Sequence, residues 1–197
     1  RHAPYKYIDA SGGEDYAVPD ADAPVTTLTF KTLSDPFVGK ISIMKVITGE
    51  LKSGMELINT RTGKVEKLNK LIFLRGKTQI DTQSASMGDI VAVPKLTYTE
   101  TGDTLCDKSK SRTYVSLESP APTLYTAVAP AKKGEEEKMG TGLARLREED
   151  PSFVVRQDTE TKQTLLGTQG EMQLGVIISK LKERFNVDVI TSPRKIA

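Results

Sequence analysis

The sequence is poor in the residues that most often build metal and redox sites. Its 197 residues include one histidine, His2, one cysteine, Cys106, and no tryptophan. A single cysteine excludes an internal disulfide, and one histidine with one cysteine cannot supply a Cys/His zinc site. We therefore expect no metal site in this chain, and we interpret Cys106 as a small residue of a buried strand.

Long apolar runs and an excess of either charge are also missing. No stretch approaches the ~20 apolar residues that a membrane-spanning helix needs, and no signal-like apolar segment follows the N-terminus. We expect no membrane partner, a cytoplasmic location and a monomeric chain. Lys and Arg total 28 against 26 Asp and Glu, so any surface for nucleic acid must be local. The chain starts at Arg1 rather than Met, which leads us to expect a piece of a longer protein.

The sequence also lacks the motifs of common enzyme classes. There is no Gly-x4-Gly-Lys-Ser/Thr loop to cradle phosphates and no Gly-x-Ser-x-Gly nucleophile elbow. The acidic run 148–150 is interpreted as a solvated helix end, because charge runs seldom need another explanation. The sequence thus predicts no catalytic residue within this chain.

Residues 1–23 predict an extended connector. They contain Gly-Gly, prolines and acidic residues without a steady period. Three tyrosines in this segment, Tyr5, Tyr7 and Tyr16, can pin it onto another surface.

Residues 24–118 predict a small closed β-barrel. "VTTLTFKTLSD" alternates like a strand, and "GKISIMKVITG" alternates through Ile41 and Ile43 before a slip at Val46, as at a bulge or bend. Short apolar segments such as "MELIN", "KLIFL" and "DIVAV" then follow one another between glycine turns. Many short strands without a helical stretch favour a barrel, whose closure removes exposed sheet edges.

Residues 119–197 predict a ferredoxin-like α+β domain. Pro120 and Pro122 end the repeated pattern of short strands and turns. The elements that follow have the order β-α-β-β-α-β. The first helix is expected in "EEEKMGTGLARLREED", and "SFVVRQD" and "QTLLG" form a hairpin. The second helix, "EMQLGVIISKLKERF", ends at Asn186, which takes the left-handed position, and "VDVI" forms the last strand. The apolar positions of the second helix are spaced for burial: Leu174, Ile177, Ile178, Leu181 and Phe185.

Several segments resemble the elongation factor G family, the ribosomal translocation GTPases. "LTFKTLSDPFVGKISIMKVITGELKSG", "GDIVAV" and "TGDTLCD" are similar to its second domain. "LARLREEDPSFVVRQDTETKQTLLGTQGEMQLGVIISKLKERFNVDV" is similar to its third. The resemblance covers roughly residues 24–197 in the family's domain order. It implies a translation-factor barrel followed by a ferredoxin-like domain, with residues 1–23 leading from a GTPase domain that is absent from this chain.

The resemblance implies that the barrel contacts small-subunit ribosomal RNA. Its matching motif is "SDPFVGK", in which Gly39 permits a close backbone approach and Lys40 can meet a phosphate. For each lysine, simple exposure to solvent and contact with RNA remain equally weighted alternatives. Because side chains alternate along strands, not all of these basic residues can share one face. The candidate RNA contacts are Ser34, Gly39, Lys40, Lys45, Lys70, Arg75 and Lys77.

The start of the second helix resembles the family's surface toward the GTPase domain and the ribosome. The candidates there are Gly170, Glu171 and Gln173. Glu171 matches a family acid, whereas Gln173 stands in place of a histidine and Gly175 in place of a second acid. The departures predict looser coupling to GTP hydrolysis and a divergent paralogue, with a neutral surface substitution at Gln173 as the alternative.

Taken together, the sequence predicts a ribosome- and rRNA-contacting fragment of a GTPase that promotes movement of tRNA and mRNA. The expected partners are small-subunit rRNA and protein and the GTPase domain of the same parent chain. GTP and magnesium are expected in the parent protein and not in this chain. Two alternatives stay open: a ribosomal-protection or other specialised translational GTPase, and a free-standing RNA-binding adaptor.

Overall fold

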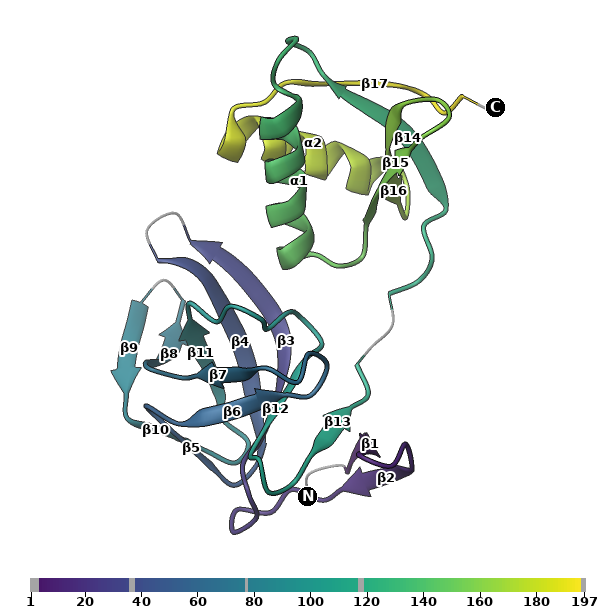
Figure 1. Ribbon diagram of the computed structural model, residues 1–197. Helices are drawn as coiled ribbons and strands as arrows, with labels where there is room; N and C mark the ends of the chain where they lie inside the picture. The colour runs from purple at the N-terminus through teal and green to yellow at the C-terminus, as the bar shows by residue number, and fades with distance from the viewer. Residues whose placement is uncertain (1–3, 36–37, 77, 117–118, 196–197) are drawn as a thin grey trace. The chain divides into compact units, whose positions relative to one another are not determined.

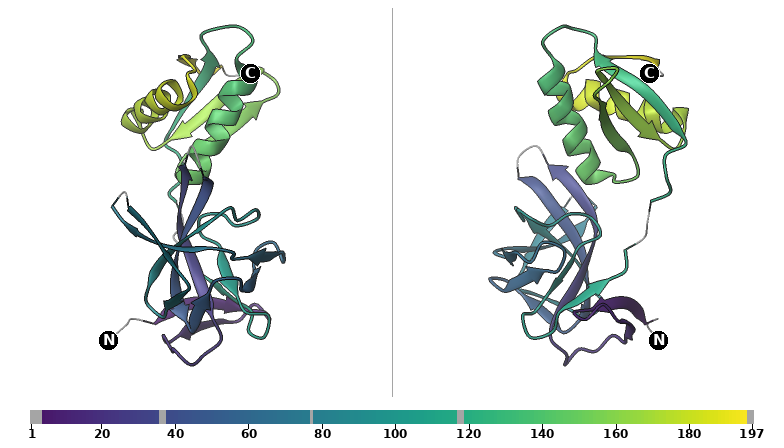
Figure 2. Two further views of the ribbon diagram at one scale, coloured as in Figure 1. Left: turned by 90° about the vertical axis from the view of Figure 1, so that its left-hand side faces the viewer. Right: turned by 45° about the vertical axis from the view of Figure 1, so that its right-hand side comes forward.

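A computed structural model of the protein describes residues 4–35, 38–76, 78–116 and 119–195. Over these residues the chain forms two compact units, 1–117 and 118–197, which are described separately (Figures 1 and 2). The first is built from strands, and the second carries helices α1 and α2. The expected order of an all-β domain before an α+β domain is confirmed.

The first unit is an antiparallel β-barrel (Figure 1). Its main sheet runs in the order β7 (Val65–Lys67), β6 (Glu56–Asn59), β12 (Thr104–Cys106), β3 (Thr26–Asp35), β4 (Gly39–Thr48), β11 (Ile90–Pro94), β8 (Leu71–Arg75) and β9 (Thr78–Thr82). A separate pair, β5 (Glu50–Lys52) and β10 (Ser84–Ser86), contributes Leu51 and Ala85 to the same core. Pairs of short strands joined by glycine turns thus surround one apolar interior, as the sequence predicts.

Both faces of β4 are buried. Met44 and Val46 face the barrel core, whereas Ile41 and Ile43 belong to a second cluster with Ile72. The expected slip between Ile43 and Val46 is thus a change of buried face, and it coincides with irregularities in the pairing of β3 with β4.

Two bulges of the β3–β4 ladder border this stretch. The register shifts at Ile47 in β4 and at Phe30 in β3. Phe30 is consequently exposed, at 45% of its surface. Bulges of this kind increase local twist, which a small barrel needs in order to bend its longest strands.

The prediction of an extended connector at residues 1–23 is wrong for the described part of that segment. β1 (Tyr5–Asp9) and β2 (Glu14–Ala17) form a hairpin, and β1 also pairs with β13 (Arg112–Tyr114). Buried tyrosines explain the difference, because Tyr7 and Tyr114 pack edge to face and belong to one cluster with Ile47. The sequence shows no period here because each strand buries a single side chain, Tyr7 in β1 and Ala17 in β2, and so has no alternating apolar face.

The second unit is a ferredoxin-like α+β domain. Its described strands form one antiparallel sheet in the order β15 (Val154–Asp158), β16 (Gln163–Thr168), β14 (Leu124–Pro130) and β17 (Val189–Pro193). Helices α1 (Glu136–Glu149) and α2 (Glu171–Phe185) lie on the same side of this sheet (Figures 1 and 2). The predicted order of elements is confirmed, although the last strand begins at Val189 rather than Val187.

The helices pack closely through a glycine. A Cβ atom at Gly142 of α1 would lie 2.8 Å from a methyl carbon of Leu181 in α2. Of the apolar residues expected to be buried in α2, Ile177 and Leu181 are fully so, while Leu174 and Phe185 are partly buried against the core. Asn186 ends α2 with φ 51° and ψ 47°, which confirms the predicted left-handed cap.

Candidate functional site

The candidate loop between β3 and β4 is a hairpin end with a defined backbone. Ser34 pairs with Lys40 and Asp35 with Gly39 across the ladder. The Asp35 carboxylate accepts a hydrogen bond of 2.8 Å from the Val38 N–H. Gly39 has a φ of 84°, a conformation that favours glycine, and a Cβ added there would meet nothing within 4 Å. The hairpin thus presents open backbone at Gly39 beside the Lys40 side chain, while residues 36 and 37 lie outside the described residues.

Lys45 lies further along β4 and already has an aromatic neighbour. Its ammonium is 5.5 Å from the ring centroid of Tyr5, which belongs to the N-terminal hairpin. A cation over an aromatic face is stabilised by the ring quadrupole. Lys45 therefore joins the barrel wall to the N-terminal hairpin, a role that the sequence did not predict.

The remaining basic candidates are on β8 or next to it. Lys70 makes an exposed ion pair of 2.9 Å with Asp81 of β9. Arg75 is the exposed last residue of β8, opposite Thr78. Lys77 lies outside the described residues. Pairing with Asp81 leaves Lys70 less available to a phosphate than Arg75.

Strand alternation separates these candidates as expected. Lys45 lies on the same face of β4 as Ile41 and Ile43, whereas Lys40 has the opposite parity. The structure brings together Ser34, Gly39 and Lys40 on one hairpin and does not gather all the basic candidates into one patch.

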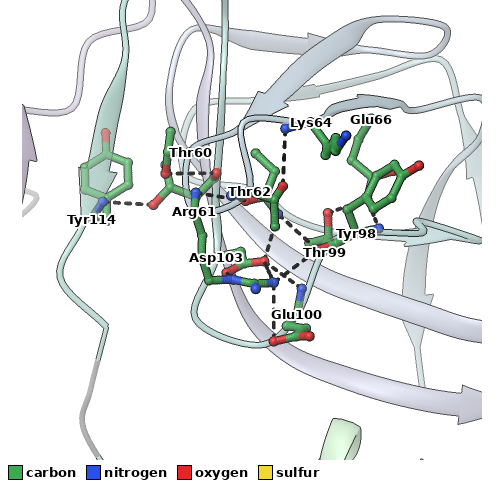
Figure 3. A network of polar contacts seen from close by, with 12 residues as sticks. Thr60, Arg61, Thr62, Lys64, Glu66, Tyr98, Thr99, Glu100, Asp103 and Tyr114 are labelled. Carbon is green, nitrogen blue, oxygen red and sulfur yellow. Dashed lines mark hydrogen bonds and ion pairs between the residues drawn. The ribbon is translucent and has the colours of Figure 1, made fainter. Parts of the chain in front are cut away.

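A buried carboxylate organises a part of the barrel that sequence reasoning missed (Figure 3). Asp103 is 5% exposed. It accepts hydrogen bonds from Asn59 Nδ2 at 2.7 Å, from Arg61 Nε at 2.6 Å and from the Glu100 N–H at 2.8 Å. Burial alone would raise the pKa of Asp103, but hydrogen bonds from Arg61 and Asn59 outweigh it and lower the pKa. The only hint in the sequence is an acidic residue at the start of the apolar segment "DTLC".

Glu66 plays a similar part on β7. This 4% exposed carboxylate accepts hydrogen bonds from the Tyr98 N–H at 2.6 Å and from the Thr99 hydroxyl at 2.9 Å. Glu66 and Asp103 together fasten the segment 97–103 to β6 and β7 (Figure 3). Because these buried carboxylates accept hydrogen bonds from neighbouring strands and loops, we assign them to the support of the barrel.

Gln173 in α2 is held inside its own unit. Its side-chain oxygen accepts a hydrogen bond of 2.8 Å from the Gln169 N–H, and its nitrogen donates to the Ser152 hydroxyl at 2.6 Å. Gln173 is therefore a half-buried, hydrogen-bonded residue, and its interpretation as a neutral substitution stays a prediction. Its neighbours Gly170 and Glu171 lie at the helix start, and Glu171 is exposed.

This arrangement explains how α2 begins. Gly170 is the N-cap and supplies no side chain, so a cap must come from elsewhere. Gln173, the third residue of the helix, reaches back to the N–H that precedes the cap, much as the glutamate or glutamine of a capping box does. The first turn is thereby tied to the segment after α1.

The acidic run at the end of α1 is only partly a solvated helix end. Glu149 is paired through both carboxylate oxygens with the Arg184 guanidinium, at 2.8 and 2.9 Å. Asp150 accepts a hydrogen bond of 3.0 Å from the Ser152 N–H. Hydrogen bonds from Ser152 and Gln173 outweigh the effect of burial and lower the pKa of Asp150. Two of the three acidic residues therefore fasten α1 to α2.

The described residues contain no metal-binding arrangement. No group of three or more His, Cys, Asp or Glu among them could hold an ion, and none of their helices is long and apolar enough to cross a membrane. Cys106 is fully buried in β12, as predicted, and burial raises the pKa of its thiol. A protonated, buried thiol is a poor nucleophile.

Comparisons with known proteins match both units. A family profile described as "Elongation factor G domain 2" matches residues 24–108, and one described as "Elongation Factor G, domain III" matches residues 119–193. A crystal structure of a protein from Thermus thermophilus is similar over 89% of this chain, with a TM-score of 0.79 and 29% sequence identity. The chain spans 26% of the length of that protein.

Proposed function

Because the chain belongs to the elongation factor G family, whose domains II and III it contains, we propose that it is the ribosome-contacting part of a translational GTPase. The parent protein would promote movement of tRNA and mRNA. The observation that carries the proposal is the presence of both domains in one chain and in the family's order. A free-standing RNA-binding adaptor would not need this pair.

In this proposal the barrel contacts small-subunit ribosomal RNA through the Ser34–Lys40 hairpin. The open backbone at Gly39 admits a close approach of the RNA. Lys40 supplies a positive charge for a phosphate, a contact that does not depend on the base sequence. The overall charge balance, 28 basic against 26 acidic residues, agrees with a local contact rather than a broad basic surface.

The start of α2 is the proposed surface toward the GTPase domain of the parent. The exposed Glu171 and the backbone at Gly170 form the contact, and Gln173 holds them in place from inside the unit. GTP and magnesium bind in that absent domain, in the cytoplasm. Isothermal titration of this chain with GTP and magnesium should accordingly show no saturable heat.

Sedimentation with purified ribosomes tests the proposal. The chain should pellet with the small subunit, and Lys40→Glu should weaken binding several-fold, since each phosphate contact contributes a salt-dependent term. Lys110→Glu makes the same charge change on an exposed loop of the barrel unit and should bind like wild type. Failure to pellet with either subunit would reject ribosome contact by this chain.

A further inference from the structure

The sheet of the second unit has a face that neither of its helices covers. Helices α1 and α2 lie on one side of it (Figure 1). The opposite side of the central strands carries Tyr125 and Ala127 of β14 and Leu165 and Gly167 of β16. Leu165 and Ala127 are only 4% and 3% exposed, so longer neighbours must shield them. An open sheet face with a shielded apolar floor is unlike an ordinary solvated surface.

The Tyr125 ring packs against Gly167, its cross-strand partner, and Tyr125 is partly exposed. A Cβ atom at Gly167 would lie 2.7 Å from the Tyr125 ring and 2.7 Å from Val154. Any larger residue would displace the ring. The glycine therefore lets the aromatic ring lie close to the sheet, where Tyr125 lines a hollow.

Two arginines flank the platform. Tyr125, Leu165, Arg156 and Arg194 line a hollow of about 250 Å³, which the 157–160 turn closes on one side. Arg156 projects from the edge strand β15, opposite Leu165. In the described parts of the chain, neither arginine is in an ion pair of 4 Å or less.

The backbone on both sides of Arg194 is held by the side chain of Gln163. The Gln163 amide nitrogen donates to the Pro193 carbonyl at 3.4 Å, and its oxygen accepts from the Lys195 N–H at 2.9 Å. Asp158 lies in the same hollow, but its carboxylate accepts hydrogen bonds from the Glu160 and Thr161 N–H groups of its own turn. Hydrogen bonds from Thr161 chiefly, and the charge of Arg194 to a lesser extent, lower the pKa of Asp158. The hollow thus carries two acidic residues, Asp158 and Glu160, beside its two arginines.

We propose that this face binds an unpaired segment of RNA, with one base stacked on Tyr125 and the adjoining phosphates beside Arg156 and Arg194. Stacking on an aromatic platform between cations is how four-stranded sheets recognise single-stranded RNA, whose bases are free to splay out. The acidic 157–160 turn directs the phosphate backbone away from that wall. The inference deepens the proposed function, on which it rests for the source of the RNA, and it adds a contact independent of the Ser34–Lys40 hairpin.

The test is fluorescence anisotropy of the 197-residue chain with a labelled 12-nucleotide single-stranded RNA and, separately, its duplex. We expect preference for the single strand. Tyr125→Leu should weaken binding about fivefold or more, because it removes a stacked base, and Tyr125→Phe should bind like wild type. Arg156→Gln and Arg194→Gln should each lower the slope of log affinity against log salt by about 0.7.

Arg145→Gln is the matched control, since Arg145 is an exposed residue of α1, on the helix side of the sheet. It should leave both affinity and salt slope unchanged. Equal binding of duplex and single strand, equal losses for Arg145→Gln and Arg156→Gln, or unchanged binding by folded Tyr125→Leu would each overturn the proposal. Because no ribosomes are present, a failure here is distinct from a failure of the chain to sediment with the small subunit.

Discussion

The side-chain amide of Gln173, in the first turn of α2, donates a hydrogen bond of 2.6 Å to the hydroxyl of Ser152 in the segment after α1. The same amide accepts from the Gln169 N–H. One polar side chain thus joins the end of one helix to the start of the next. The Glu149–Arg184 pair makes a second connection between these helices.

Replacing Gln173 should therefore destabilise the second unit. Gln173→Ala removes hydrogen bonds at both ends of the amide, and we expect a loss of about 1–2 kcal/mol in the free energy of unfolding. Gln173→Glu keeps the acceptor but loses the donor and places a second carboxylate beside Asp150. Its loss should be larger at pH 7 than at pH 4, where protonation relieves the repulsion.

Urea denaturation followed by circular dichroism measures both effects. Gly175→Ala is the control, because Gly175 is exposed in the same helix and a Cβ there would meet nothing within 4 Å. It should stabilise by up to about 1 kcal/mol through helix propensity. Wild-type stability for Gln173→Ala would show that the amide is a surface group.

The Asp103 network predicts a pH dependence of barrel stability. The pKa of Asp103 is lower in the folded protein than its ordinary value, despite burial, because Arg61 and Asn59 donate to the carboxylate. Its stabilising contribution is therefore complete above the unfolded-state pKa and is lost as pH falls through the folded-state pKa. Asp103→Asn should cost about 1.5–3 kcal/mol near neutral pH, the range for a hydrogen bond to a charged group.

The difference between wild type and Asp103→Asn should shrink on acidification, and denaturation curves between pH 7 and pH 2 test this. Glu100→Gln is the comparison, because Glu100 pairs with the same Arg61 at 3.3 Å but has a 62% exposed side chain. An exposed pair contributes about 0–1 kcal/mol, so this variant should stay close to wild type. A constant difference across the pH range would show that the Asp103 charge does not stabilise the barrel.

The N-terminal hairpin should resist proteolysis and support the barrel. Tyr7 is buried and donates to Asp15 at 3.0 Å, and Arg112 of β13 stacks at 4.5 Å from its ring centroid. Deleting residues 1–18 would expose Tyr114 and Ile47, which we expect to lower barrel stability by at least about 2 kcal/mol. Limited trypsin digestion should leave the bond after Lys6 intact under native conditions, where a connector would be cut at once.

The N-terminal hairpin separates the features that the sequence alone predicts from those that it does not. The order of elements and the cap at Asn186 followed from periodicity and turn residues, which are local signals. The hairpin did not, because Tyr7 is buried by Tyr114, more than a hundred positions away, and no local pattern reports such a contact. Burial by distant partners is the general reason that propensity alone fails.

The candidate site shows the same division. Alternation along β4 correctly separated Lys40 from Lys45, since it depends only on strand parity. The aromatic partner of Lys45, the buried bonds of Gln173 and the ion pair of Lys70 all depend on residues brought together by folding. A charged or amide side chain that is expected from the sequence to be exposed can thus already form contacts within the folded unit.

Two glycines of α1 should respond to alanine in opposite ways. Gly140 is exposed, and a Cβ there would meet nothing within 4 Å, so Gly140→Ala should stabilise by up to about 1 kcal/mol through helix propensity. At Gly142 a Cβ would lie 2.8 Å from Leu181 and 3.2 Å from the Phe185 ring. Overpacking a buried contact costs about 1–3 kcal/mol, which exceeds the gain in propensity.

Gly142→Ala should therefore lower the free energy of unfolding while Gly140→Ala raises it, although both changes add the same methyl group to the same helix. Thermal unfolding of the two variants beside wild type measures the difference. Leu181→Ala combined with Gly142→Ala separates the causes, because it removes the methyl group that the new Cβ meets. The double variant should then be more stable than the sum of the single effects predicts, since the Gly142→Ala penalty arises from that contact. Additive losses would mean that the penalty lies in the helix itself and not in its packing against α2.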